Sequence, residues 1–204
     1  MIVTSVVAVL ISYLLGSISF SVVLAKTLKG IDIRQHGSGN AGATNTLRVL
    51  GKGPAVLVLT LDVLKGIAAV WLGRWLGGDS EWVPALCGIA AIVGHNWPIY
   101  FRFRGGKGIA TTIGVMATLV FFPALYAGII AIGSIFITRY VSLGSLLFVG
   151  LTPIFLLIMG HFGPYFWTSL IIAVFAFWRH RTNIVKIAQG KENKLGSKGG
   201  NRVV

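Results

Sequence analysis

The sequence predicts an all-α fold, a polytopic membrane helical bundle with about seven transmembrane helices, the amino terminus outside and the carboxyl terminus in the cytoplasm. Of its 204 residues, 55% are hydrophobic and only 11% are charged, and the mean hydropathy is +0.83. Soluble globular domains do not carry so apolar a composition. Long apolar runs alternate with short gaps that hold most of the basic residues. These observations predict helices in lipid, where every backbone polar group must be paired internally.

The apolar runs define the expected membrane helices. They cover residues 2–25, 54–76, 83–101, 109–138, 143–159 and 164–178. The first run has no basic segment before it and no clear small-residue cleavage point, which favours a first span over a secretory signal. Several runs barely reach the roughly 20 residues that a crossing needs, so we expect some tilted or partly interfacial helices.

The fourth run, 109–138, decides the topology. It forms either one over-long helix or two short ones with a hinge near Phe122-Pro123. One crossing would separate the basic carboxyl-terminal segment from the basic loop 26–53, against the rule that positive loops stay inside. Two crossings place all of the 18 Lys and Arg residues except Lys65 and Arg74 on the cytoplasmic side. The charges therefore predict two helices here and seven spans in total.

The chain is interpreted as one integral-membrane domain, 1–190, followed by a polar and disordered tail, 191–204. The single cysteine, Cys87, lies inside an apolar run, which predicts packing rather than a disulfide or a thiol metal site. The net charge of +13 comes from short loops between spans and not from a patch with aromatic residues, so nucleic acid is not expected as a partner. Anionic lipid and anionic substrates remain as partners that this positive charge could bind.

The loop 34–48 holds a dense set of groups that suit an anion. Its glycines match G-x-G-x-x-G, but no strand precedes them, so a dinucleotide fold is not indicated. Glycines let backbone N–H groups approach an anion, and a helix that starts near Thr44 would direct its amino end at it. The candidate side chains are Ser38, Asn40, Thr44, Asn45 and Arg48. The alternative is an ordinary hydrogen-bonded turn between spans.

A second glycine-rich segment, 103–112, places Lys107 and three glycines at the cytoplasmic start of a span. This again indicates an anion site at a helix amino terminus. The segment lacks the leading glycine of a Walker A loop and the Ser or Thr directly after the lysine, so nucleoside triphosphate binding is not indicated. Alternatively, the neighbouring arginines only follow the positive-inside rule.

Further polar residues lie within or at the ends of the spans. Asp62 and Lys65 share a helix face, as a structural ion pair or as a substrate contact. His180 and Asn183 share a face at the cytoplasmic end of the last span and could bind a hydroxyl or phosphate, or exchange a proton. Ser142 brings a hydroxyl to the same side, and His95 is a candidate whose expected role is a buried hydrogen bond.

Two absences narrow the chemistry. No histidine is followed at the fifth position by aspartate, so the His-x4-Asp acyltransferase motif is missing. The acidic residues expected near the cytoplasmic side are Asp32, Asp62 and Glu192, which are too few and too dispersed for a magnesium ion that bridges phosphates. We therefore expect no metal and no cofactor.

The chain resembles the bacterial glycerol-3-phosphate acyltransferases that use acyl phosphate as donor, the PlsY family, over nearly all of 1–190. The resemblance is carried by Gly16-Ser-Ile18, GSGNAGATN at 37–45, Asp62-x-x-Lys65-Gly66, GGKGIAT at 105–111, Arg139-Tyr-Val-Ser142 and Arg179-His-Arg-x-x-Asn-Ile184. One departure is Ser19, where the family commonly has proline, and we expect only a small effect on the helix path.

The resemblance implies transfer of a fatty acyl group from acyl phosphate to the 1-hydroxyl of glycerol 3-phosphate, which gives lysophosphatidic acid and phosphate in the first step of phospholipid synthesis. It also implies three sets of site residues. Catalysis would involve Ser142, His180 and Asn183. Glycerol 3-phosphate would contact Ser38, Arg48, Gly105, Gly106, Lys107 and Gly108. Acyl phosphate would contact Gly39, Asn40, Gly42, Thr44 and Asn45. Three further candidates are Lys65, His95 and Thr111.

The expected location is the bacterial inner membrane, with several spans and with the active site facing the cytoplasm. Besides the two substrates, the expected partners are membrane lipid and a soluble enzyme that produces acyl phosphate. Either His180 or the leaving phosphate of the donor takes the hydroxyl proton, and we favour the phosphate. An organophosphate transporter would use similar basic loops, but no inverted repeat is visible and the charge is one-sided. A lipid-binding scaffold would need no paired phosphate sites.

Overall fold

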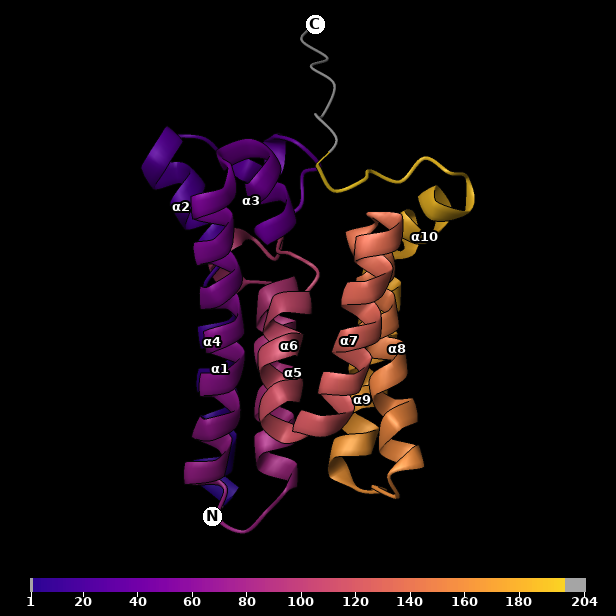
Figure 1. The fold of residues 1–204 in the computed structure, drawn as a ribbon. Helices are drawn as coiled ribbons and strands as arrows, with labels where there is room; N and C mark the ends of the chain where they lie inside the picture. The colour runs from indigo at the N-terminus through magenta and orange to yellow at the C-terminus, as the bar shows by residue number, and fades with distance from the viewer. Residues whose placement is uncertain (1, 197–204) are drawn as a thin grey trace, which may run out of the picture.

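The computed structural model describes residues 2–196, which form a bundle of helices without any strand (Figure 1). The all-α prediction is thus confirmed over this range. The helices are α1 (Ile2–Gly16), α2 (Phe20–Lys29), α3 (Ala43–Leu50), α4 (Lys52–Leu76), α5 (Trp82–Asn96), α6 (Ile109–Leu119), α7 (Phe121–Thr138), α8 (Val141–Ile158), α9 (Pro164–Arg179) and α10 (Arg181–Ala188), with 3-10 turns at Ile33–Gln35 and Ile99–Phe101.

The long helices stand side by side in two groups. In one group α1 packs on α5, and α4 packs on α5 and α6; in the other α7 packs on α8, and α8 packs on α9. The short helices α2, α3 and α10 lie at the end of the bundle opposite the amino terminus, with α10 on the other side of that end from α2 and α3 (Figure 1). Glycines allow the closest contacts: a Cβ atom on Gly94 would lie 2.2 Å from the Tyr13 carbonyl oxygen of α1, and one on Gly114 would lie 2.1 Å from the Val63 carbonyl oxygen of α4.

The predicted first span, 2–25, is interrupted. Helix α1 ends at Gly16, and α2 begins only at Phe20. The ammonium group of Lys65 lies at this break, where it donates hydrogen bonds to the carbonyl oxygens of Gly16 (3.0 Å) and Ile18 (2.8 Å). The interruption therefore arises because a buried cation in α4 binds carbonyl groups that a continuous helix would use internally.

The predicted division of 109–138 is confirmed, with the break at Val120, two residues before Phe122. Helix α6 has only 11 residues, about 16 Å, which is roughly half the thickness of the hydrocarbon core. By length and composition, the described stretches that could cross a membrane are Ile2–Lys29, Lys52–Leu76, Phe121–Thr138 and Val141–Ile158. Seven crossings and the sides of the two termini stay predictions.

The segment after α10 contacts the bundle. The backbone N–H of Leu195 donates to the Arg139 carbonyl oxygen (2.7 Å), and the Arg139 guanidinium donates to the Leu195 carbonyl oxygen from Nε (3.1 Å) and Nη2 (2.8 Å). Residues 191–196, which belong to the predicted disordered tail, are therefore attached to the turn between α7 and α8. The rest of that tail, 197–204, lies outside the described residues.

Candidate functional site

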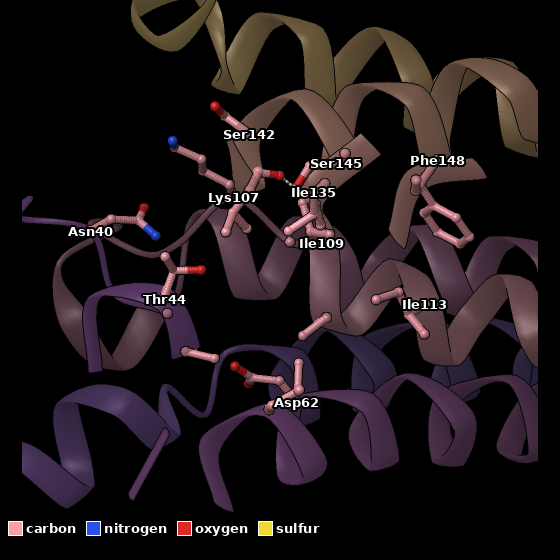
Figure 2. A pocket seen from close by; sticks show the side chains of 18 of the residues that line it. Asn40, Thr44, Asp62, Lys107, Ile109, Ile113, Ile135, Ser142, Ser145 and Phe148 are labelled. Atoms are coloured by element: carbon pink, nitrogen blue, oxygen red, sulfur yellow. Dashed lines mark hydrogen bonds between the residues drawn. The ribbon is translucent and has the colours of Figure 1, made fainter. Parts of the chain in front are cut away.

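A cavity of about 970 Å³ opens at the end of the bundle that carries α2, α3 and α10, and it continues between the helices. Its outer part is polar, and Figure 2 shows the side chains of Asn40, Thr44, Lys107 and Ser142 around it. Its inner part is lined by aliphatic and aromatic residues of α4, α6 and α7, such as Ile113, Phe121 and Ile129. One continuous space therefore joins a polar mouth to an apolar groove.

The first glycine-rich loop is shaped by Asn45, at the start of α3. Its Oδ1 atom accepts a hydrogen bond from the Ser38 backbone N–H (2.8 Å), and its Nδ2 atom donates to the carbonyl oxygens of Ile33 (3.1 Å) and His36 (2.9 Å). The amide is fully buried. Both ends of this side chain are used inside the protein, so the structure favours a role in shaping the loop over the predicted contact with substrate.

Helix α3 begins at Ala43 with Gly42 as its N-cap, close to the predicted start near Thr44. Its first residues line the cavity mouth, where the side chains of Asn40 and Thr44 also lie (Figure 2). A helix amino terminus carries partial positive charge and free donors, which favours an anion. Arg48 lines the same region, and among the described residues no hydrogen bond or ion pair occupies its guanidinium.

The second glycine-rich loop presses against the end of α5. The Gly106 backbone N–H donates to the His95 carbonyl oxygen (3.1 Å). A Cβ atom at Gly105 would lie 2.0 Å from that same oxygen, and one at Gly106 would lie 2.2 Å from Nε2 of His95. No side chain fits at either position. The loop then enters α6 at Ile109, as predicted, through Gly108 with φ of 80°.

Arg179, at the last position of α9, holds the outer side of this loop. Its guanidinium donates to the carbonyl oxygens of Gly106 (2.6 Å from Nη2, 3.2 Å from Nε) and Gly105 (3.2 Å), and it stacks over the Trp97 ring. Arg179 was not among the predicted site residues. Its place within the Arg-His-Arg segment was the available signal for a role in the site.

A chain of polar side chains crosses the mouth of the cavity. Lys107 Nζ donates to Asn183 Oδ1, and Asn183 Nδ2 donates to both carboxylate oxygens of Glu192 (2.9 and 3.1 Å). Burial lowers the pKa of Lys107 to about 8; repulsion from Arg179 and Arg48 adds to this shift, whereas the Glu192 carboxylate opposes it. Lys107 is therefore a cation at neutral pH that is held away from bulk water.

His180 is a neutral imidazole at neutral pH. It is 2% exposed, and burial together with the nearby Lys107 lowers its pKa to about 4. Its Nδ1 atom lies 2.8 Å from the Ala176 carbonyl oxygen, which can only accept, so Nδ1 carries the proton and Nε2 is the acceptor. The buried Ser142 hydroxyl lines the same cavity and has no hydrogen-bond partner among the described residues.

The structure brings most of the predicted residues to this one cavity. Those that line it are Ser38, Gly39, Asn40, Gly42, Thr44, Asn45, Arg48, His95, Gly105, Lys107, Gly108, Ser142, His180 and Asn183. Gly106, Lys65 and Thr111 do not line it. Gly106 faces His95, Lys65 is engaged at the break after α1, and Thr111 is fully buried. Charged lining residues that were not proposed as site residues include Lys52, Asp62, Lys186 and Glu192.

Comparison with known proteins supplies the family. The profile of the family "Glycerol-3-phosphate acyltransferase" matches residues 6–190. A glycerol-3-phosphate acyltransferase of Shouchella clausii is 61% identical over 203 residues, which cover 97% of this chain and 99% of the relative. One of Halalkalibacterium halodurans is 61% identical over 192 residues, covering 92% and 93%.

Two solved structures are similar over almost the whole chain. Both are crystal structures of PlsY (YgiH), an integral membrane glycerol 3-phosphate acyltransferase. Its glycerol 3-phosphate form has a TM-score of 0.89 and 39% identity, covering 95% of this chain and 96% of that one. Its lysophosphatidic acid form has a TM-score of 0.86 and 38% identity, covering 96% and 97%. The chain described here therefore belongs to the glycerol-3-phosphate acyltransferase family of PlsY, whose members are integral membrane acyltransferases.

Proposed function

We propose that the protein transfers a fatty acyl group from acyl phosphate to the 1-hydroxyl of glycerol 3-phosphate, without a metal ion. The observation that carries the proposal is the single cavity that joins a cationic, donor-rich mouth to an apolar groove. Two phosphate-bearing substrates, one with a long acyl chain, need such a combination. The similar PlsY structures were solved in glycerol 3-phosphate and lysophosphatidic acid forms, which supports this acceptor and this product.

Glycerol 3-phosphate would bind through Lys107, Arg48 and Ser38, with Gly105, Gly106 and Gly108 shaping the backbone around the phosphate. Lys107 is half-buried and charged at neutral pH, and Arg48 is not engaged within the described residues. Both cations are therefore available to an anion. A phosphate dianion between them would gain charge-assisted hydrogen bonds at a site that is partly shielded from water.

Acyl phosphate would bind at the start of α3, where Gly39, Gly42, Asn40 and Thr44 surround the free N–H groups of the helix. Its acyl chain would follow the groove along α6, which is about 16 Å long and thus close to one leaflet of a bilayer. Asn45 would act indirectly here, by shaping the loop.

In the proposed reaction the 1-hydroxyl oxygen attacks the acyl carbon, a new ester bond forms, and the bond from that carbon to the phosphate oxygen breaks. The leaving phosphate takes the hydroxyl proton. Acyl phosphate is a mixed anhydride with a good leaving group, so positioning and charge stabilisation can supply the catalysis. A histidine with a pKa of about 4 is a weak base at neutral pH, which supports assistance by the substrate over His180 as base. His180, Ser142 and Asn183 would orient the reacting groups.

The proposed orientation places the amino terminus outside and the site in the cytoplasm of a bacterial inner membrane. Its support is that the basic loops and the cavity mouth gather at one end of the bundle, opposite the amino terminus (Figure 1). A soluble cytoplasmic enzyme that makes acyl phosphate would then deliver the donor from the side on which the cavity opens.

The test is to supply purified protein with glycerol 3-phosphate and, in separate reactions, acyl phosphate, an acyl thioester of acyl carrier protein, or acyl-CoA. Of the three donors, only acyl phosphate should give product, and lysophosphatidic acid and inorganic phosphate should then appear in equal amounts. Excess EDTA should leave the rate of this reaction unchanged. Product formed only from a thioester would refute the proposed donor. Uptake of glycerol 3-phosphate by sealed vesicles without any product would instead support a transporter.

A further inference from the structure

Two buried side chains of the cavity, Asp62 and His95, have no part in the proposed reaction. Both line the cavity, although they are only 1% and 5% exposed. Asp62 belongs to α4 and His95 to the last turn of α5. Figure 2 shows the Asp62 carboxylate on the side of Thr44 away from Ser142. A charged side chain at membrane depth normally faces a partner or a ligand.

The ionisable neighbours of the Asp62 carboxylate lie at one of its two oxygens. Lys65 Nζ lies 2.8 Å from Oδ1, and His95 Nδ1 lies 3.5 Å from the same atom. Among the described residues neither carboxylate oxygen accepts a hydrogen bond of good geometry, and Oδ1 is fully buried whereas Oδ2 is not. Leaving a buried carboxylate without donors is costly, so Oδ2, the oxygen with some exposure to the cavity that Asp62 lines, is expected to accept a hydrogen bond from something in that cavity.

Lys65 also determines which nitrogen of His95 carries the proton. Its ammonium group lies 3.0 Å from Nδ1, and because an ammonium can only donate, Nδ1 is the acceptor. The neutral imidazole then carries its proton on Nε2. That nitrogen lies against the glycine loop, since a Cβ atom at Gly106 would be 2.2 Å away. Among the described residues no hydrogen bond ends on Nε2, and it is not one of the fully buried unpaired atoms, so the cavity that His95 lines presents an acceptor, Asp62 Oδ2, together with a donor, His95 Nε2–H.

We propose that Asp62 and His95 bind the C2 hydroxyl of glycerol 3-phosphate and thereby select it against phosphorylated alcohols that lack this group. A hydroxyl can donate to the carboxylate and accept from the imidazole, whereas a phosphate would be repelled by the carboxylate. Lys65 neutralises the charge of Asp62, so the carboxylate is better suited to accept a hydrogen bond than to remove a proton. This favours the C2 hydroxyl, which does not react, over the 1-hydroxyl, which does. The inference rests on the proposed function for the identity of the acceptor.

The test compares glycerol 3-phosphate with 3-hydroxypropyl phosphate, which lacks only the C2 hydroxyl. The wild type should prefer glycerol 3-phosphate in kcat/KM by at least about a hundredfold, because a site built around a hydroxyl rejects its deoxy analogue. The double variant Asp62→Leu/Lys65→Met removes both charges together, which a fold tolerates better than loss of one. It should lower kcat/KM for glycerol 3-phosphate to that of the analogue and leave the analogue within about threefold of its wild-type value.

The control is Asp79→Asn, which removes an exposed carboxylate from the turn between α4 and α5 and should change neither value. Equal use of both acceptors by the wild type, or an equal loss on both in the double variant, would overturn the proposal. If the double variant does not fold, His95→Leu tests the proposal instead, because it keeps the charges of both Asp62 and Lys65. This variant must bind glycerol 3-phosphate at least about tenfold more weakly than the wild type does and bind the analogue equally well.

Calorimetric binding separates this proposal from the proposed function, since it needs no acyl donor. If acyl phosphate yields no product, but the wild type still binds glycerol 3-phosphate in preference to the analogue and the variants lose that preference, the proposed function fails and the inference stands. If product forms equally well from both acceptors, the inference fails and the function stands.

Discussion

The two glycine-rich loops at the cavity mouth are held in place by different means. The loop 33–42 is shaped by one side chain outside it, because the Asn45 amide bonds three backbone groups of the loop. The loop 102–108 is held by its own backbone and by Arg179, which binds two of its carbonyl oxygens. The first loop presents side chains such as Ser38 and Asn40 to the cavity, whereas the second loop presents Lys107.

This difference means that the two loops should tolerate substitution differently. The first loop depends on a buried amide, whose loss leaves the Ser38 N–H without a partner and removes one of two hydrogen bonds at each of the Ile33 and His36 carbonyl oxygens. The second depends on the absence of Cβ atoms, because it lies in direct contact with α5. A substitution that adds volume should therefore harm the second loop most, and one that removes a hydrogen bond should harm the first.

The largest effect is expected from Gly106→Ala. The new Cβ atom would lie 2.2 Å from Nε2 of His95 and 2.5 Å from the Ala41 carbonyl oxygen, so the loop must move and displace Lys107. A displacement of about 1 Å at a reacting group can cost about a hundredfold in rate, and we expect kcat/KM for glycerol 3-phosphate to fall by that order. The matched control is Gly133→Ala in α7, where no atom lies within 4 Å. An active Gly106→Ala enzyme would contradict the tight contact.

A smaller loss is expected from Asn45→Ala. The Ser38 N–H would lose its partner, and the Ile33 and His36 carbonyl groups would each lose one of two donors, at a cost of about 2 kcal/mol or about thirtyfold in the population of the native loop. Activity should fall with both substrates, because the loop carries residues proposed for each. The activity of the control variant Thr46→Val, which loses one hydrogen bond to the Gly42 carbonyl oxygen, should fall much less. Equal kcat/KM values for Asn45→Ala and the wild type would show that the loop keeps its shape without the amide.

Replacing Arg179 by lysine tests the other side of the second loop. A lysine cannot reach both carbonyl groups with the fixed geometry of a guanidinium, so the loss of about one hydrogen bond should raise KM for glycerol 3-phosphate by about tenfold with little change in kcat. Arg181→Lys is the control, since the Arg181 guanidinium donates to the Trp178 carbonyl oxygen and lies over the exposed Trp178 ring instead of holding the loop. A change in kcat alone would indicate that Arg179 acts on the chemical step rather than on the loop.

Much of this arrangement can be predicted from sequence, and what cannot has a physical reason. Hydropathy and charge predicted the division of 109–138, and the two glycine-rich segments predicted helix starts near Thr44 and at 109, where the structure has Ala43 and Ile109. An amide side chain suits both contact with a substrate and the shaping of a loop, so the residue type of Asn45 could not tell which of these two roles it has. The break after Gly16 depends on Lys65, 47 to 49 residues away along the chain, and the hydropathy of the first run contains no trace of it.

The pH dependence of acceptor binding gives the smallest effect and concerns the lysine that the second loop presents. The pKa of Lys107 is lowered to about 8, so the side chain is a cation below that pH and becomes neutral above it. Only the cation attracts the phosphate of glycerol 3-phosphate, and kcat/KM reports the free enzyme, so kcat/KM should fall about fourfold between pH 7 and pH 8.5. In Lys107→Arg the guanidinium stays charged over this range, so its profile should lack the fall even if its rate is lower. A wild-type profile that stays flat to pH 10, or the same fall in Lys107→Arg, would show that another group titrates or that Lys107 does not bind the phosphate.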